Sequence, residues 1–209
     1  MRLQTWSYEI DNGIALLKRC SEEACNADDN RLLLELDRII DIVENDARVR
    51  VMIITGTTID GDISSGFEPN QVKFEQFLYL LNHVVNKLER LHKPKIAAIK
   101  GKTFNLFFEL VLACDFRIAA SSSLMGEQNL TLSAMPGGEG FMRLSRLIGS
   151  GRSNVIALTY EMIDTVMAEE YGLVNQVVAD ANLLEEAKKM ALQILFRSSE
   201  INTLLKECN

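Results

Sequence analysis

The chain has 209 residues, of which 47% are hydrophobic, 24% are charged and only 3 are proline. This length fits one globular domain with a small appendage, and the composition excludes a disordered or collagen-like chain. The formal net charge of -7 argues against nucleic acid as the main partner, because phosphate binding depends on clustered Lys and Arg. No apolar run approaches the roughly 20 residues that a membrane helix needs, so no membrane association is expected.

The N-terminal sequence MRLQTWSYEI lacks the charged start and apolar run of a signal peptide, so we expect a cytoplasmic protein. The 4 cysteines are then expected to be thiols. They show no CxxC spacing, and with only 2 histidines in the chain no metal site is expected. A Ser-His-Asp triad is not expected either, since neither His83 nor His92 has a nucleophile motif nearby.

The first part of the chain alternates strand and helix patterns. An apolar run over residues 10–18 with the turn signal Asp11-Asn12-Gly13 predicts a hairpin strand. Apolar residues at helical spacing predict a helix over residues 31–43, and the β-branched run Val51–Thr55 predicts a strand buried on both faces. The segment 57–70 is rich in glycine and small polar residues, which predicts a loop of the kind on which sites are built.

The second part continues this alternation. A helix over residues 74–91 is predicted to stop at Lys93-Pro94, and a buried strand follows over residues 96–99. The elements expected after it are helices over residues 106–113, 141–147, 152–158, 168–171 and 183–196, strands over residues 116–119 and 174–178, and a last short helix ending at Cys208. Strand-helix alternation of this kind predicts an α/β fold.

Two loops that follow buried strands are candidates to hold negative charge. Ser64-Ser65-Gly66-Phe67 follows one strand, and the segment from Gly101 to Asn105 leads from another into the start of a helix. At a helix start the N–H groups lack intrahelical acceptors, and the helix dipole favours developing negative charge. If the two loops face each other, they form an oxyanion pocket. The alternative is that both are ordinary strand-to-helix turns.

Glu109 is the one carboxylate inside the apolar stretch FNLFFELVLAC. A carboxylate with few polar neighbours usually has a raised pKa or a dedicated partner. Glu109 is therefore a candidate acid or base, and the alternative is a helix residue that pairs with Arg117 or Arg143. Asp115 and Arg117 are expected to form a structural pair at the helix end. The run Pro136-Gly137-Gly138-Glu139-Gly140 predicts a tight turn that opens a helix.

Several motifs, in order and in register, resemble one family. PKIAAIKG, ELVLACDFRIA, PGGEGFMRLSRLIG and EEYGLVNQVV are joined by NADDNRLLLEL and VRVMIITG upstream. Together they cover nearly all of residues 8–197 and resemble the crotonase family, the enoyl-CoA hydratases and isomerases. The resemblance implies a crotonase-like spiral of β-β-α units over residues 1–160, and a shortened helical oligomerisation segment over residues 161–209. It also implies an acyl-CoA thioester as the ligand and assembly as a homotrimer or dimer of trimers.

The resemblance assigns roles to individual residues. The backbone N–H groups of Phe67 and Leu106 would form the oxyanion hole that holds the thioester oxygen. Glu109 matches the first of the two glutamates with which hydratases activate and deliver water, and the second glutamate position falls at Asn129. The other residues expected to line the substrate site are Ser65, Gly66, Gly101, Pro136 and Gly137.

Two departures from the family pattern leave the reaction open. Asn129 cannot transfer a proton, and the family's glycine run before the first glutamate is replaced by Asn105-Leu106-Phe107-Phe108. In the first hypothesis the protein is a crotonase-type lyase, isomerase, hydrolase or decarboxylase. It acts on an acyl group carried by CoA or by a carrier protein, with Glu109 as the single acid/base. In the second it is a non-catalytic subunit or acyl-CoA-binding module. Neither hypothesis requires a cofactor besides the coenzyme A of the substrate.

Overall fold

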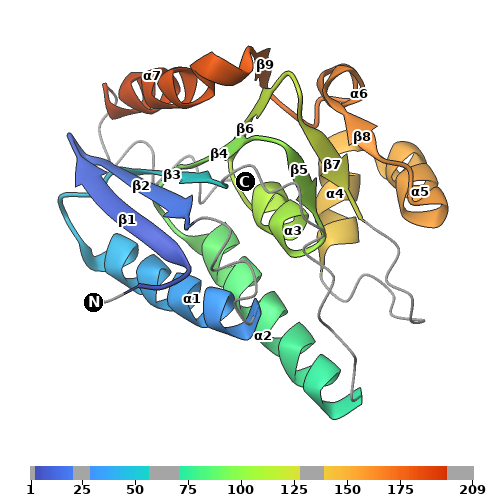
Figure 1. The fold of residues 1–209 in the computed structure, drawn as a ribbon, viewed down its shortest axis with the longest axis horizontal. Helices are drawn as coiled ribbons and strands as arrows, with labels where there is room; N and C mark the ends of the chain where they lie inside the picture. The colour runs from blue at the N-terminus through green and yellow to red at the C-terminus, as the bar shows by residue number, and fades with distance from the viewer. Residues whose placement is uncertain (1–2, 21–28, 57–70, 128–138, 197–209) are drawn as a thin grey trace.

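The computed structural model describes residues 3–20, 29–56, 71–127 and 139–196 (Figure 1). These residues build an α/β fold around a six-stranded sheet with the strand order β1-β2-β3-β4-β6-β9. β1 and β2 pair antiparallel, and the remaining neighbours pair in parallel. The strands are β1 (Trp6–Asp11), β2 (Ile14–Arg19), β3 (Val51–Thr55), β4 (Lys95–Ile99), β6 (Phe116–Ala120) and β9 (Gln176–Val178).

The predicted turn and hairpin strand are confirmed with other bounds, because β2 begins at Ile14 and residues 10 and 11 belong to β1, which the sequence did not predict. Asn12 and Gly13, which connect β1 and β2, have φ angles of 49° and 86°. Positive φ at both central residues is the requirement of a type I′ turn, whose twist matches that of the two strands. The Asn-Gly pair in the sequence therefore fixes where the chain turns from β1 into β2.

Helices cover both faces of this sheet, as Figure 1 shows. The helices α1 (Asp29–Asn45), α2 (Gln71–Arg90) and α3 (Leu106–Leu112) pack on one face, and α7 (Leu183–Leu195) packs on the other. Successive residues of a strand point to opposite faces. Accordingly Met52 and Ile54 of β3 join the core under α1 and α2, whereas Val51 and Ile53 join the core under α7. The predicted burial of this strand on both faces is thus confirmed.

The structure has a second sheet that the sequence did not predict. It has three strands, β5 (Lys102–Phe104), β7 (Leu124–Gly126) and β8 (Ile163–Asp164), in the order β5-β7-β8. β5 and β7 pair in parallel, and β7 and β8 pair antiparallel. Each strand has two or three residues, which is too short for a periodic apolar pattern to show. This small sheet matters for the site because β5 leads directly into α3.

The remaining helices are α4 (Gly140–Ile148), α5 (Ser150–Thr159) and α6 (Thr165–Glu170), with a short 3-10 helix, η2 (Asp180–Asn182), before α7. α6 begins earlier than predicted because the Asp164 side chain caps it, accepting the N–H of Met167 at 2.8 Å. β9 starts two residues later than predicted. The predicted helix ending at Cys208 lies outside the described residues. The division at residue 160 stays a prediction.

A buried lysine ties β4 to the end of α3. Lys95 is fully buried, and its ammonium lies 3.1 Å from the carboxylate of Asp115. Arg117, also buried, donates to the carbonyl oxygens of Leu173 at 2.6 Å and Cys114 at 2.5 Å. The sequence predicts a pair between Asp115 and Arg117, whereas in the structure Asp115 pairs with Lys95 and Arg117 binds backbone carbonyl oxygens. None of the helices in the described ranges is both long and apolar enough to cross a lipid bilayer.

Candidate active site

Glu109 is buried in α3, with only 4% of the residue exposed. One oxygen of its carboxylate lies 3.4 Å from Nη1 of Arg143, and the backbone N–H of Gly140 also donates to the carboxylate. Burial raises the pKa of Glu109 above its ordinary value, by more than Arg143 and the Gly140 N–H lower it. A buried carboxyl group with a raised pKa is suited to proton transfer near neutral pH.

The cation that faces Glu109 is engaged elsewhere. Arg143 is 2% exposed and lies on α4. Its Nη2 and Nε atoms donate to Oε2 of Glu89 at 2.8 Å and 3.1 Å, and Nη2 also donates to Oδ1 of Asn86 at 2.5 Å. Glu139 lies 3.4 Å from the same Nη2 atom. One oxygen of Glu89 therefore accepts two close hydrogen bonds from the guanidinium, and Glu109 receives only a long contact. Because its contact with Arg143 is long, the effect of burial on the pKa of Glu109 is larger than the effect of Arg143.

The carboxylate of Glu109 lies directly against the backbone of Gly140, the first residue of α4. A Cβ atom added at Gly140 would overlap both carboxylate oxygens and the Cδ atom of Glu109. Glycine at this position therefore allows the helix start to approach the carboxylate and to donate its N–H. The tight turn predicted before this helix includes Pro136 and Gly137, which lie outside the described residues.

The turn before α3 keeps a strained shape without the family's glycines. Asn105 has φ 50° and ψ -117°, a conformation that side-chain-bearing residues rarely adopt. Two backbone hydrogen bonds hold it: its N–H donates to the carbonyl oxygen of Gly126 at 3.1 Å, and its own carbonyl oxygen accepts the N–H of Glu109 at 2.9 Å. Leu106 follows as the first helical residue, so its N–H has no intrahelical acceptor. The Leu106 side chain is buried in the main core.

Glu127 is a second carboxylate of the site, and the sequence analysis missed it. It directly follows β7 and is partly buried. Burial, and after it the charge of Glu109, raises the pKa of Glu127 to about 8. Recognising β7 in the sequence would have drawn attention to a charged residue at a strand end. The family's glutamate spacing pointed instead to Asn129, two residues further on.

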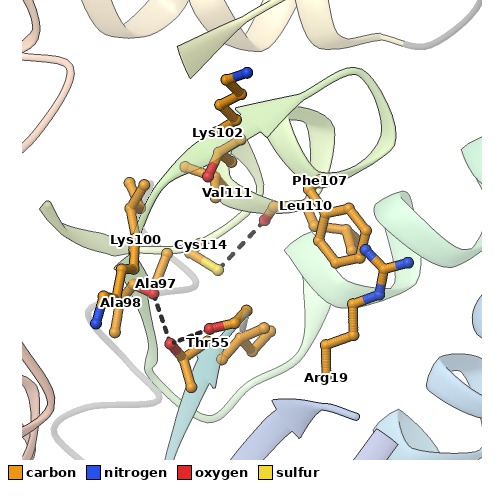
Figure 2. A pocket seen from close by; sticks show the side chains of 14 residues that line it. Arg19, Thr55, Ala97, Ala98, Lys100, Lys102, Phe107, Leu110, Val111 and Cys114 are labelled. Carbon is orange, nitrogen blue, oxygen red and sulfur yellow. Dashed lines mark hydrogen bonds between the residues drawn. The ribbon is translucent and has the colours of Figure 1, made fainter. Parts of the chain in front are cut away.

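A pocket of about 530 Å³, including its open part, lies beside α3 at the carboxyl ends of β3 and β4 (Figure 2). The pocket is lined by three residues of α3 and one residue just after it: Phe107, Leu110, Val111 and Cys114. Their spacing of three or four residues puts them on one face of the helix, and Glu109 does not line the pocket. The guanidinium of Arg19 lies over the Phe107 ring, 4.6 Å from its centroid.

Among the predicted site residues, the structure describes Gly101, Leu106 and Glu109, and it brings them into one strand-turn-helix segment. Gly101 has φ 69°, and its carbonyl oxygen accepts the N–H of Leu124 at 3.0 Å, which places β7 beside β5. The roles predicted for the other residues stay predictions, because these residues lie outside the described ranges: Ser65, Gly66, Phe67, Asn129, Pro136 and Gly137. Within the described ranges, no group of three or more His, Cys, Asp and Glu side chains is placed to hold a metal ion.

Known proteins share the whole of this architecture. The family model described as enoyl-CoA hydratase/isomerase matches residues 9–208. The chain is 34% identical over 200 residues to the short-chain-enoyl-CoA hydratase of Clostridium acetobutylicum, covering 93% of this chain and 77% of the relative. It is 34% identical over 192 residues to the crotonyl-CoA hydratase of Syntrophomonas wolfei, covering 90% of this chain and 74% of the relative.

Solved structures agree with the sequence relatives. The enoyl-CoA hydratase from Bacillus anthracis superposes with a TM-score of 0.89 at 33% identity, covering 98% of this chain and 81% of that one. The fold with its second small sheet and the helix that carries Glu109 is therefore the crotonase fold. The chain belongs to the enoyl-CoA hydratase/isomerase family, as the motifs indicated.

Proposed function

We propose that this protein is an enzyme that acts on an acyl thioester, with Glu109 as an acid/base group beside an oxyanion hole. The observation that carries the proposal is the buried Glu109 carboxyl group, whose pKa is raised while the facing Arg143 is held by Glu89. Arg143 acting without the effect of burial would lower this pKa. The N–H of Leu106 is proposed as one oxyanion donor, and that of Phe67 as the second. A donor of this kind typically contributes about 3 to 4 kcal/mol of transition-state stabilisation.

The proposed substrate is a short 2-enoyl thioester of coenzyme A. The names of the two relatives, short-chain-enoyl-CoA hydratase and crotonyl-CoA hydratase, support this choice. In such a substrate the thioester oxygen gains charge as the enolate forms, and backbone N–H groups can stabilise it. Lys100 and Lys102 line the pocket beside α3 and are candidates to meet the phosphates of coenzyme A. Coenzyme A acts here as the handle of the substrate, and no separate cofactor is proposed.

The second candidate function is a non-catalytic acyl-CoA-binding module or subunit. Two features of the sequence favour it: Asn129 at the second glutamate position, and bulky residues in place of the glycine run before Glu109. This candidate predicts binding of acyl-CoA without turnover. Binding and turnover must therefore be measured separately.

Crotonyl-CoA is expected to raise the melting temperature of the protein and to be turned over. A ligand that binds only the folded state at 100 times its Kd stabilises that state by about 2.7 kcal/mol, which is several degrees for a chain of this size. The measurement is thermal unfolding with crotonyl-CoA and with free coenzyme A as the control. A thioester panel assayed for hydration, isomerisation and hydrolysis accompanies it. A thermal shift without any turnover would support the binding module, and no shift would contradict both candidates.

We also propose that the chain forms a homo-oligomer of three or six copies, through α4, α5 and α6, which lie together at one side of the fold (Figure 1). These helices and the residues between them expose large apolar side chains, with Leu158 at 81% and Val166 at 73%. The other large apolar side chains that these segments expose are Phe141, Met142, Val155, Tyr160 and Met162, and we infer that together they form an apolar patch. Exposed apolar patches of this kind mark interaction surfaces.

The double variant Leu158→Glu, Val166→Glu is expected to be monomeric, because it places two charges in the apolar patch. Light scattering coupled to size-exclusion chromatography measures the mass. Leu34→Glu on α1, where the leucine is 47% exposed, is the matched control and should leave the mass unchanged. A wild-type protein that runs as a monomer would contradict the proposed assembly.

A further inference from the structure

We propose that Glu127 is the second proton-transfer group of the site. It would have the role that a glutamate at position 129 has in a hydratase with two glutamates. The inference rests on the proposed function of Glu109. It assigns a catalytic role to a residue that follows β7, and it makes Asn129 unnecessary as a proton donor. Three observations support it: the position of Glu127 in the fold, the absence of a partner for its carboxylate among the residues that the structure describes, and the effect of the Glu109 charge on Glu127.

The small sheet places Glu127 beside the start of α3. β5 and β7 run parallel, and Phe104 at the end of β5 is in register with Gly126 at the end of β7. The residues that follow two parallel strands emerge at the same edge of the sheet, so Glu127 emerges beside Asn105. A hydrogen bond from the Asn105 N–H to the Gly126 carbonyl oxygen, at 3.1 Å, fixes this neighbourhood. Glu109 lies one helical turn further on, with its N–H bonded to the Asn105 carbonyl oxygen.

The two carboxyl groups have different surroundings. Arg143 and the Gly140 N–H favour the ionised form of Glu109, whereas Glu139 opposes it. Glu127 has no hydrogen bond or ion pair with any other residue that the structure describes, and the charge of Glu109 acts against its ionisation. Of the two groups, Glu127 is therefore the one that keeps its proton at neutral pH. A partly buried carboxyl group that keeps its proton beside a second carboxylate is suited to donate that proton.

The pair supplies both proton steps of a hydration. An O–H bond of water breaks, its proton passes to the Glu109 carboxylate, and the oxygen forms a bond to the β-carbon of the enoyl thioester. The π electron pair of the double bond moves into the thioester as an enolate. The α-carbon then takes the proton from the Glu127 carboxyl group. Glu109 is left protonated and Glu127 ionised, and transfer of the proton from Glu109 to Glu127 restores the starting state.

The test is the variant Glu127→Gln, compared with wild type in crotonyl-CoA hydration. We expect kcat to fall by about 10² to 10⁴-fold, the range of general acid-base catalysis. The melting temperature and its shift with crotonyl-CoA should stay unchanged, because a neutral amide replaces a neutral carboxyl group. The wild-type kcat/KM should fall above about pH 8, where Glu127 loses its proton, and this fall should be absent in the variant. The charge of Glu109 acts on Glu127, and the charges of Arg143 and Glu139 act on Glu109.

Two further variants separate this inference from the proposed function. Glu185→Gln removes an exposed carboxylate on α7, on the other face of the main sheet, and should match wild type. Glu127→Gln combined with Asn129→Glu should recover at least about tenfold of the lost activity, within the range of one acid-base group. If Glu109→Gln is inactive while Glu127→Gln hydrates at the wild-type rate with the wild-type pH profile, this inference is overturned and the proposed function stands. A wild-type protein that turns over no thioester overturns both.

Discussion

Replacement of Glu109 by glutamine is expected to lower kcat for thioester turnover by about 10³-fold while binding of crotonyl-CoA stays within a few-fold of wild type. The size of the loss is the middle of the range for a general acid-base group. Glutamine has the same shape, and its side-chain oxygen can still accept from Nη1 of Arg143 and from the Gly140 N–H. The variant loses the negative charge and the ability to transfer a proton.

The stability of this variant is a second readout, and its sign follows from the raised pKa of Glu109. A carboxyl group with a higher pKa in the folded state stabilises the fold below its unfolded pKa, and this contribution is lost as the pH rises through the folded pKa. Once it ionises, Glu109 therefore costs stability relative to a neutral side chain. Glu109→Gln should unfold at the wild-type temperature or above it at pH 7, and its advantage should disappear near pH 4, around the ordinary pKa of a glutamate.

These measurements separate a catalytic Glu109 from a structural one. Glu185→Gln again serves as the control, because Glu185 is exposed on α7. Wild-type turnover by Glu109→Gln would refute the proposed role. A lower melting temperature together with lost binding would show instead that Glu109 serves chiefly as the structural partner of Arg143.

The central strands of the main sheet could be predicted from the sequence because each one carries a local apolar pattern. Val51–Thr55 and Lys95–Ile99 each contain a run of four apolar residues next to turn residues, and both are buried strands in the structure. The small sheet could not be predicted in this way. Lys102–Phe104 and Leu124–Gly126 are three residues each, and their pairing joins segments far apart in the chain. Tertiary contacts, not local patterns, create these strands.

The site was predictable in the same uneven manner. Glu109 was found because a charge within an apolar helix is a local signal. The hydrogen bonds between Arg143 and Glu89 could not be predicted, because Glu89 lies 54 residues from Arg143 in the sequence and on another helix. Glu127 was missed for a related reason: its importance comes from β7, which carries no pattern of its own. The sequence thus identified the carboxylate and named Arg143 as a possible partner, and the fold showed that Glu89 takes the closer contacts of that guanidinium.

The variant Gly140→Ala is expected to lower kcat/KM by at least about 100-fold while the fold remains intact. The new methyl group would overlap the Glu109 carboxylate, which must then move away from the Gly140 N–H and from its contact with Arg143. A displacement of about 1 Å in a catalytic group can cost about 100-fold in rate. Alanine is a better helix former than glycine, so the gain at the start of α4 partly offsets the cost of moving the carboxylate.

The matched control is Gly151→Ala in α5, where an added Cβ atom would meet no other atom within 4 Å. Gly151→Ala should keep wild-type kcat/KM and stabilise the fold by about 0.4 to 1 kcal/mol, the usual gain from such a replacement at a compatible position. Steady-state kinetics on crotonyl-CoA and thermal unfolding of both variants provide the comparison. If Gly140→Ala keeps full activity, the Glu109 carboxylate can move without consequence, and its role as a precisely positioned proton-transfer group is wrong. If only Gly140→Ala loses activity while both variants stay folded, the position of that carboxylate, and not the stability of the helix, determines the rate.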